Sequence, residues 1–133
     1  MARLGDRLSD LFFRWVLDRS VEEAHQAGLR LLKHNLSPGQ QHQLELFSFF
    51  DVVGGDSGSH YRIHFDDRVN VERLDASGKT IAKLCFLPKG HLPVGDTVLA
   101  QKFALELFET EALRVAARVS PLPLSCVPRE SRC

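Results

Sequence analysis

Cysteine is scarce in this sequence, and no two cysteines lie close together. The 133 residues include only Cys85, Cys126 and Cys133, an odd number with no CxxC pair. This spacing argues against a disulfide framework and against a zinc site, and it favours a reducing compartment. The six histidines do not suggest a metal site either, because no pair combines the helical i, i+4 spacing with a supporting carboxylate. We therefore expect no metal and no cofactor.

An excess of charge of either sign is also missing. Seventeen basic residues balance seventeen acidic residues, and the balance holds in each third of the chain. The basic surface typical of nucleic-acid-binding proteins is therefore not expected. Long apolar runs are absent as well, which argues against a transmembrane segment. Charges at Arg3, Asp6 and Arg7 argue against a signal peptide, so we expect a cytoplasmic protein.

The first segment, residues 2–19, has the periodicity of an amphipathic helix. Its main apolar face consists of Leu4, Leu8, Leu11, Phe12 and Trp15. Phe13 and Leu17 lie on the other side, which indicates a helix that contacts something on two sides. Acids and bases are equal in number on its polar face, so packing onto the domain or onto another copy is favoured over binding to a membrane surface. The candidate residues for this oligomer or partner helix are Leu8, Phe12, Phe13 and Trp15.

Two further helix starts follow. Ser20 and Glu23 form a capping box, which predicts that the chain bends and that a new helix runs to about Asn35. A stripe of mostly small residues in this helix, including Gly28, permits close helix packing. Ser37 and the proline after it predict a short third helix that ends near residue 47.

The remainder of the chain predicts a sheet and one long helix. Strands are expected at 49–53, 61–65, 69–72 and 80–87, with a tight turn at 75–78. The last helix begins near residue 96 and ends near residue 118, and its polar residues Lys102, Glu106 and Glu109 lie opposite its apolar face. The fold class is α+β: N-terminal helices, a four-stranded antiparallel meander and a long C-terminal helix packed on the sheet. We divide the chain into an amphipathic helix (1–19), a single α+β domain (20–118) and a flexible, proline-containing tail (119–133).

The loop after the first strand contains Gly55-Asp56-Ser57-Gly58, the letters that surround the nucleophilic serine of chymotrypsin-like proteases. Those enzymes need a histidine base, a carboxylate and an oxyanion hole, held by far more chain than is present here. A phosphate-binding loop would need a helix after it, and a strand follows instead. The sequence favours a turn in which the glycines take positive φ and the polar residues bond local backbone.

Polar residues of two neighbouring strands are expected to cluster on one face of the sheet. The candidate binding surface consists of Tyr61, Arg62, His64, Asn70, Glu72 and Arg73. A solvated outer face is the ordinary interpretation, and a recognition surface is the functional one. An enzyme that uses His64 with Glu72 or Asp51 is a further hypothesis, although nothing in the sequence fixes a substrate pocket. Cys85 lies in an apolar strand and is expected to be a buried structural residue.

A resemblance covers roughly residues 35–117. It is carried by Leu36-Ser37-Pro38, Phe50-Asp51-Val52-Val53-Gly54, Gly58, Tyr61-Arg62-Ile63, Asn70-Val71, Leu74-Asp75, Gly78, Leu84-Cys85, Pro88, Leu92-Pro93, Gly95-Asp96, Leu99-Ala100-Gln101-Lys102 and Ala104-Leu105-Glu106. This pattern resembles small hypothetical proteins encoded in bacterial genomes, notably alphaproteobacterial ones, and in bacteriophages. The resemblance implies a single bacterial or phage domain, and it transfers no catalytic residue.

Neutral charge, the absence of a catalytic constellation and the two-sided first helix together favour a small, non-enzymatic protein-interaction or adaptor domain. Its expected partner is another protein or a second copy of the chain. The alternative is a nucleic-acid-associated accessory protein of bacterial or phage origin, with Arg62, His64, Asn70 and Arg73 as its contact surface. Neutral net charge weighs against that alternative.

Overall fold

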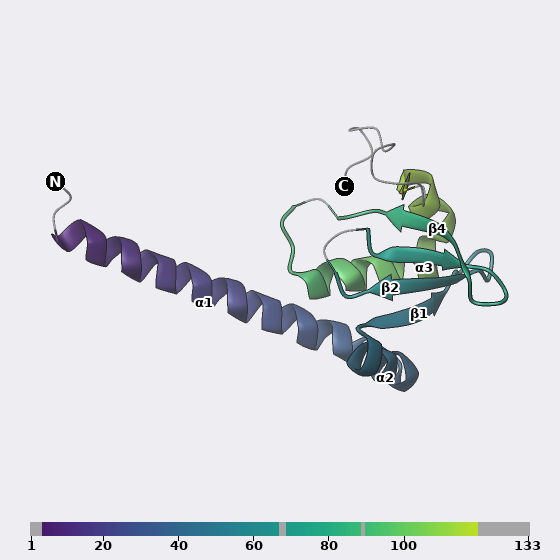
Figure 1. The fold of residues 1–133 in the computed structure, drawn as a ribbon, viewed down its shortest axis with the longest axis horizontal. Helices are drawn as coiled ribbons and strands as arrows, with labels where there is room; N and C mark the ends of the chain where they lie inside the picture. Colours follow the sequence, from purple (N-terminus) through teal and green to yellow (C-terminus); the bar gives the residue numbers. More distant parts are fainter. Residues whose placement is uncertain (1–3, 67–68, 89, 120–133) are drawn as a thin grey trace.

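The computed structural model describes residues 4–66, 69–88 and 90–119; within these ranges, the side chains of 4–9, 13 and 117–119 are not described. The elements along the chain are α1 (Leu4–His34), α2 (Pro38–Phe47), β1 (Phe49–Val53), β2 (His60–His64), β3 (Val71–Leu74), β4 (Thr80–Cys85), α3 (Val94–Val115) and β5 (Ala117–Val119). The sheet, α2 and α3 form one body, from which α1 projects (Figure 1).

The sheet is an antiparallel meander with the strand order β1-β2-β3-β4-β5. The predicted α+β class and the four consecutive strands are therefore confirmed. The fifth strand replaces the last turn predicted for the long helix. The backbone of Ala116 is extended (φ −68°, ψ 132°), and residues 117–119 pair with 83–85 of β4. Pairing there satisfies backbone groups on the outer edge of β4, which a longer helix would have left without partners. Apart from Val119, the predicted tail lies outside the described residues.

The core lies between one face of the sheet and α3. Alternation along β1 and β2 directs Phe50, Val52, Tyr61 and Ile63 to this face, and all four are buried. The core is completed by Leu32, Leu36, Leu44, Val71, Leu84, Val98, Leu99, Leu105 and Ala112. A buried amide pair also joins α3 to the sheet. Asn70 and Gln101 donate to each other at 2.7 and 2.9 Å, and each donates further to a backbone carbonyl, so neither amide is buried without partners.

The first two predicted helices are one continuous helix, so the predicted bend at Ser20 is wrong. The hydroxyl of Ser20 donates to the carbonyls of Val16 and Leu17 in the preceding turn, at 3.1 and 3.3 Å. A serine whose hydroxyl is satisfied in this way can remain inside a helix. Glu23 pairs with Arg19 instead of reaching back to the backbone of Ser20.

The C-terminal part of α1 crosses α3 at two glycines. A Cβ atom on Gly95 would overlap the carbonyl group of Gly28 and the backbone nitrogen of Leu29. Two helix backbones can approach this closely only where one of them carries no side chain. The small-residue stripe predicted around Gly28 therefore marks a true helix crossing, and the crossing fixes α1 to the body.

The short helix α2 is tied to β1 by two glutamines. Its start follows the predicted Ser37, which forms a capping box with Gln40. Gln40 also donates from Nε2 to the carbonyl of Asp51 at 2.9 Å, and Gln43 Oε1 accepts from the N–H of Asp51 at 2.9 Å. Both backbone groups of one residue in β1 are thus bonded to side chains of α2.

Gly95→Ala should lower the free energy of unfolding by roughly 1–3 kcal/mol, because the added methyl group forces α1 and α3 apart. Urea denaturation followed by circular dichroism measures the change. The matched control is Gly39→Ala in α2, where a Cβ atom would have no neighbour within 4 Å. That substitution should leave the stability unchanged or raise it by about 0.4–1 kcal/mol. Equal losses in the two variants would contradict a close helix crossing.

Candidate functional site

The loop between β1 and β2 encloses the carboxylate of Glu109, which is 1% exposed. The backbone N–H groups of Asp56 and Ser57 donate to Glu109 Oε2 at 2.9 and 2.7 Å. The hydroxyl of Tyr61 donates to Oε1 at 2.7 Å, and the hydroxyl of Ser57 donates to the same oxygen. Four donors from a segment about fifty residues away therefore hold one side chain of α3.

Two glycines allow this loop to lie directly against the helix. A Cβ atom on Gly54 would overlap the Glu109 carboxyl group, and one on Gly55 would overlap the carbonyl of Glu106. The N–H of Gly55 donates to the Leu105 carbonyl at 3.0 Å. In an unbroken α-helix that carbonyl would accept from the residue four positions later.

The helix is kinked at this point, because Phe108 has non-helical φ and ψ of −138° and 43°. Beyond the kink, the carboxylate of Asp56 accepts hydrogen bonds from the N–H and the hydroxyl of Thr110, at 2.9 and 2.7 Å. Asp56 thus acts as a cap for the last part of α3, supplied by another segment of the chain. These bonds lower the pKa of Asp56.

The electrostatics of Glu109 follow from its donors. Burial alone would raise its pKa, but hydrogen bonds from the hydroxyls of Ser57 and Tyr61 and from the two backbone N–H groups outweigh burial and lower the pKa to about 2. The pKa of Tyr61 shifts in the opposite direction. Burial and its bond to the carboxylate raise the pKa of its phenol to about 12. The pair is therefore an anion and a neutral donor at neutral pH.

This geometry makes Ser57 a structural residue. Its hydroxyl bonds to Glu109 and Ser59, and no histidine takes part in its described hydrogen bonds. The turn interpretation needs a correction, because only Gly58 of the loop's glycines has positive φ (73°), and Asp56 bonds to α3 rather than to local backbone. Glu109 was not among the sequence candidates, since the sequence analysis placed it opposite the apolar face of the last helix. That placement is wrong, because the buried face of α3 includes Lys102, Leu105, Glu109 and Ala112 at regular helical spacing.

The outer face of the sheet gathers three of the predicted surface residues. Arg62 donates to both carboxylate oxygens of Asp51, at 2.8 and 3.1 Å, and its guanidinium lies 4.1 Å from the centre of the Phe49 ring. His64 Nε2 lies 2.8 Å from Glu72 Oε2. Burial would raise the pKa of Glu72, but its bonds with His64 and Thr80 lower it overall. Arg62 and His64 are thus each paired with a neighbouring carboxylate.

The structure does not bring the other three predicted residues to this face. Tyr61 points into the core, because strand alternation places it opposite to Arg62. Asn70 is buried against Gln101. Arg73 pairs in register with Tyr61, and its guanidinium donates to Ser59 Oγ at 3.0 Å. The candidate surface therefore reduces to Arg62, His64 and Glu72.

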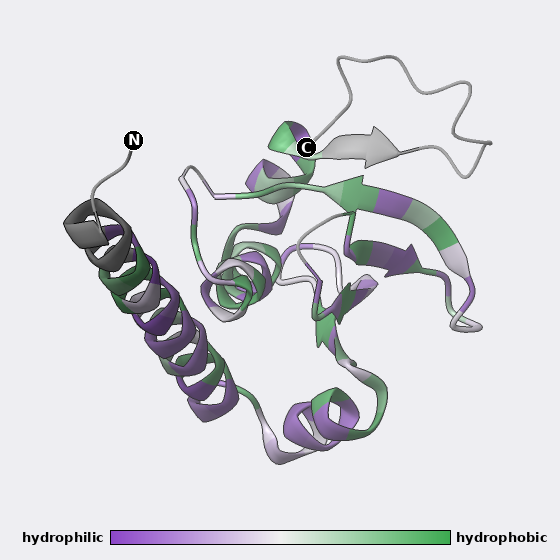
Figure 2. Cartoon of the chain, turned by 60° about the vertical axis from the view of Figure 1, so that its left-hand side comes forward, coloured by the Kyte–Doolittle hydropathy of each residue, from purple (hydrophilic) through white to green (hydrophobic). Residues whose placement is uncertain are grey.

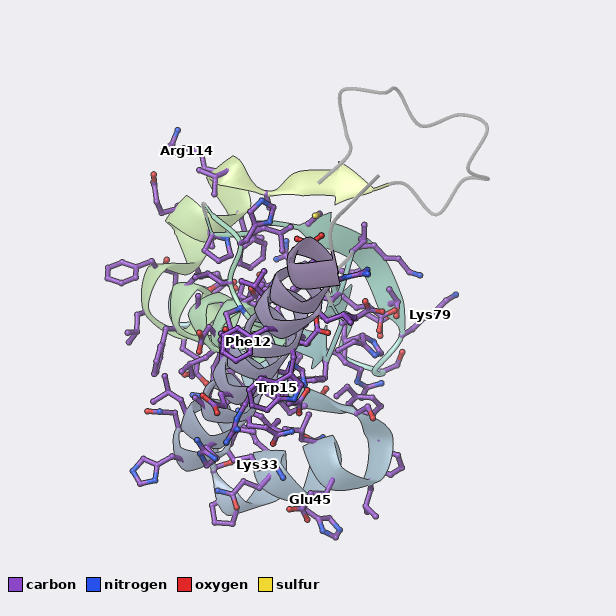
Figure 3. The ribbon with its side chains drawn as sticks, turned by 90° about the vertical axis from the view of Figure 1, so that its left-hand side faces the viewer. Phe12, Trp15, Lys33, Glu45, Lys79 and Arg114 are labelled. Atoms are coloured by element: carbon purple, nitrogen blue, oxygen red, sulfur yellow. The ribbon has the colours of Figure 1, made fainter. Side chains whose placement is uncertain are left out.

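A further feature is the N-terminal part of α1, residues 10–24, which we call the free segment. Every side chain described in this segment is exposed. The exposed fractions are 62% for Leu11, 63% for Phe12 and 57% for Trp15. Figure 2 shows hydrophobic residues along the part of α1 that stands apart from the sheet, and in Figure 3 Phe12 and Trp15 lie on the helix in front of the body. The side chains of Leu8 and Phe13, also predicted for this helix, lie outside the described part.

Neither a metal site nor a membrane-spanning helix is found within the described ranges. No group of three or more histidine, cysteine, aspartate or glutamate side chains there could hold a metal ion. Nor does any helix among the same residues combine the length and the apolar character needed to cross a membrane. Cys85 is buried in β4, as predicted, but it is disulfide-bonded, contrary to the argument against disulfides from the cysteine spacing.

Glu109→Gln should remove part of the pH dependence of folding. The native pKa of about 2 lies below the ordinary value of 4.5, so the unfolded chain binds a proton that the folded chain does not as pH falls between these values. The stabilisation is complete above about pH 5 and is lost as pH approaches 2, in all roughly 3 kcal/mol. Urea denaturation of both proteins from pH 7 to pH 2.5 should show their free energies of unfolding converging at low pH.

Two further variants check this assignment. Tyr61→Phe removes one donor and should move the acid-induced loss to higher pH, because the native pKa of Glu109 then rises. Glu111→Gln, two residues along the same helix, should have little effect at any pH because Glu111 and its partner Arg114 are largely exposed. Parallel pH profiles for the wild-type protein and Glu109→Gln would refute the proposed role of the buried carboxylate.

Comparison with known proteins adds no family to this geometry. No family model matches the chain, and no curated protein and no solved structure matches it either. The fold and the candidate surfaces are therefore described from the contacts within this chain alone.

Proposed function

We propose that this chain is a small, non-enzymatic protein-interaction domain that binds its partner through the free segment of α1. The observation that carries the proposal is the set of large apolar side chains exposed there, with Leu11, Phe12 and Trp15 at the centre. Phe12 and Trp15 lie close to each other, with ring centres 6.3 Å apart. Neighbouring exposed aromatic residues of this kind are typical of binding hot spots.

The energetics of the helix support the same proposal. A helix segment that packs against nothing is only marginally stable in water, because most helical stability in proteins comes from burying an apolar face. Among the described side chains of α1, the first that is partly buried is His25, which lies against Phe65. A partner that covers the preceding segment would supply the missing burial, whereas the body of the domain is anchored independently at Gly28 and Gly95.

The outer face of the sheet supports the nucleic-acid alternative less well. Arg62 is bound by both oxygens of Asp51, and His64 faces Glu72. A phosphate would have to displace these carboxylates before either side chain could bind it. The same pairing also weakens the hypothesis of an enzyme that uses His64, since both carboxylates already form contacts between neighbouring strands of the sheet.

A photoreactive amino acid in place of Phe12 tests the proposal directly. We expect ultraviolet irradiation of cells that naturally make the protein to yield discrete covalent adducts, because the partner covers this position. Gel mobility and mass spectrometry identify the adducts. The matched control carries the same group at Phe108, which is equally exposed (64%) but lies on α3. The proposal fails if position 12 yields no adduct or only the pattern seen at position 108.

A further inference from the structure

We propose that the outer face of the sheet binds a second copy of this chain through a row of alternating charges that crosses four strands. The row consists of Asp51, Arg62, Glu72 and Lys83, which are successive partners in the register of β1, β2, β3 and β4. Its signs are therefore negative, positive, negative and positive from one side of the face to the other. The core and α3 lie on the opposite face of the sheet, so this contact is separate from the α1 interaction proposed above.

The side chains of this charged row reach the surface. The exposed fractions are 31% for Asp51, 28% for Arg62 and 18% for Glu72, and Lys83 is exposed. Lys83 forms no ion pair among the described residues. Asp51 accepts three hydrogen bonds, two from Arg62 and one from Gln43, and a carboxylate offers about four acceptor sites. The two ends of the row can therefore still form an ion pair with each other, between two copies.

The row is complementary to itself when one copy is reversed. A twofold axis that runs along the strands between β2 and β3 would set Asp51 opposite Lys83 of the second copy. The same axis would set Arg62 opposite Glu72 of the second copy, so that no like charges face each other along the row. The strands of the two sheets stay nearly aligned in this arrangement, which is a common mode of sheet packing. Such an isologous contact closes on itself as a dimer.

Apolar side chains beside the row also match under this axis. Val53 lies two residues after Asp51, and Ile81 lies two residues before Lys83. Because β1 and β4 run in opposite directions in the meander, Val53 and Ile81 lie on the same side of the row. Their exposed fractions are 51% and 56%, and Ile81 lines one surface hollow with Lys83 and Glu72. The second copy would therefore cover Val53 with Ile81 and remove apolar surface of both from water.

The alternating order of the charges favours a second copy over a partner with charge of one sign. Nucleic acid or an anionic membrane would meet as many acids as bases along this row. A different protein would need the same four signs in reverse order, whereas a second copy of the chain always carries them. Charge complementarity across an interface guides association and fixes its register.

Zero-length cross-linking of the full wild-type chain tests this contact directly. A carbodiimide joins a carboxylate to an amine only where the two groups touch. Within one chain Asp51 and Lys83 are three strand spacings apart, about 14 Å, which is too far for a direct amide bond. We therefore expect mass spectrometry to find an Asp51–Lys83 cross-link in a product of twice the 15.0 kDa monomer mass. A dimeric product without this cross-link would overturn the proposed face.

Charge reversal supplies the matched comparison. Lys83→Glu sets a like charge opposite Asp51 in both copies and should raise the dimer dissociation constant at least about tenfold at low salt. Sedimentation equilibrium measures the constant. Lys79→Glu makes the same change at an exposed position just before β4, outside the row, and should leave the constant unchanged.

A mixture of two variants tests the reversed arrangement. Lys83→Glu and Asp51→Lys should each associate poorly alone, because like charges then face each other at both ends of the row. Mixed together they should form a heterodimer, since one chain then carries two acids and the other two lysines at these positions. If both variants fold by circular dichroism and the mixture still does not associate, the reversed arrangement is wrong.

Other outcomes separate the sheet-face dimer from the interaction proposed for α1. A wild-type chain that stays monomeric at all concentrations overturns the sheet-face dimer and leaves the α1 proposal standing. A dimer that Phe12→Ser with Trp15→Ser weakens, and Lys83→Glu does not, places the contact on α1 and also overturns it. An Asp51–Lys83 cross-link without adducts from position 12 supports the sheet-face dimer and removes the α1 proposal.

Discussion

The body of this domain depends on one buried carboxylate. Glu109 accepts four hydrogen bonds from the loop between β1 and β2 and from β2 itself, and it can do so only because Gly54 and Gly55 leave room for α3 against the loop. The kink in α3 and the capping of Thr110 by Asp56 belong to the same arrangement. An anion with this many donors is well compensated for the loss of water, whereas a missing donor would leave charge buried at high cost.

Much of the fold could be predicted from local sequence chemistry. Alternation predicted the four strands of the meander, Ser37 and its proline predicted the start of α2, and the small residues around Gly28 indicated a close helix crossing. These features depend on residues close together in the chain. The wrong prediction of a bend at Ser20 also arose from local sequence, because serine followed three residues later by glutamate fits both a capping box and the interior of a helix. In the structure the hydroxyl of Ser20 donates to a carbonyl of the preceding turn, which is the role of a serine inside a helix.

The candidate sites were harder to predict, because they depend on contacts between distant segments. Period-two alternation correctly grouped Arg62 and His64, but the same alternation should have excluded Tyr61, which faces the core. Nothing within the sequence around Glu109 indicates that a loop fifty residues earlier will enclose it. The two adjacent glycines before Asp56 were the available signal, since glycine pairs often mark a close approach of backbones, yet they do not say to what.

The glutamines of α2 also limit how this protein can associate. An exposed edge strand invites another chain to extend the sheet, and such growth has no natural end. At the centre of β1, Gln40 already occupies the carbonyl of Asp51, and Gln43 occupies its N–H. A foreign strand would have to displace two side-chain amides before it could add there. The chain can therefore expose apolar side chains along α1 while the first strand of its sheet is protected from open-ended, amyloid-like growth.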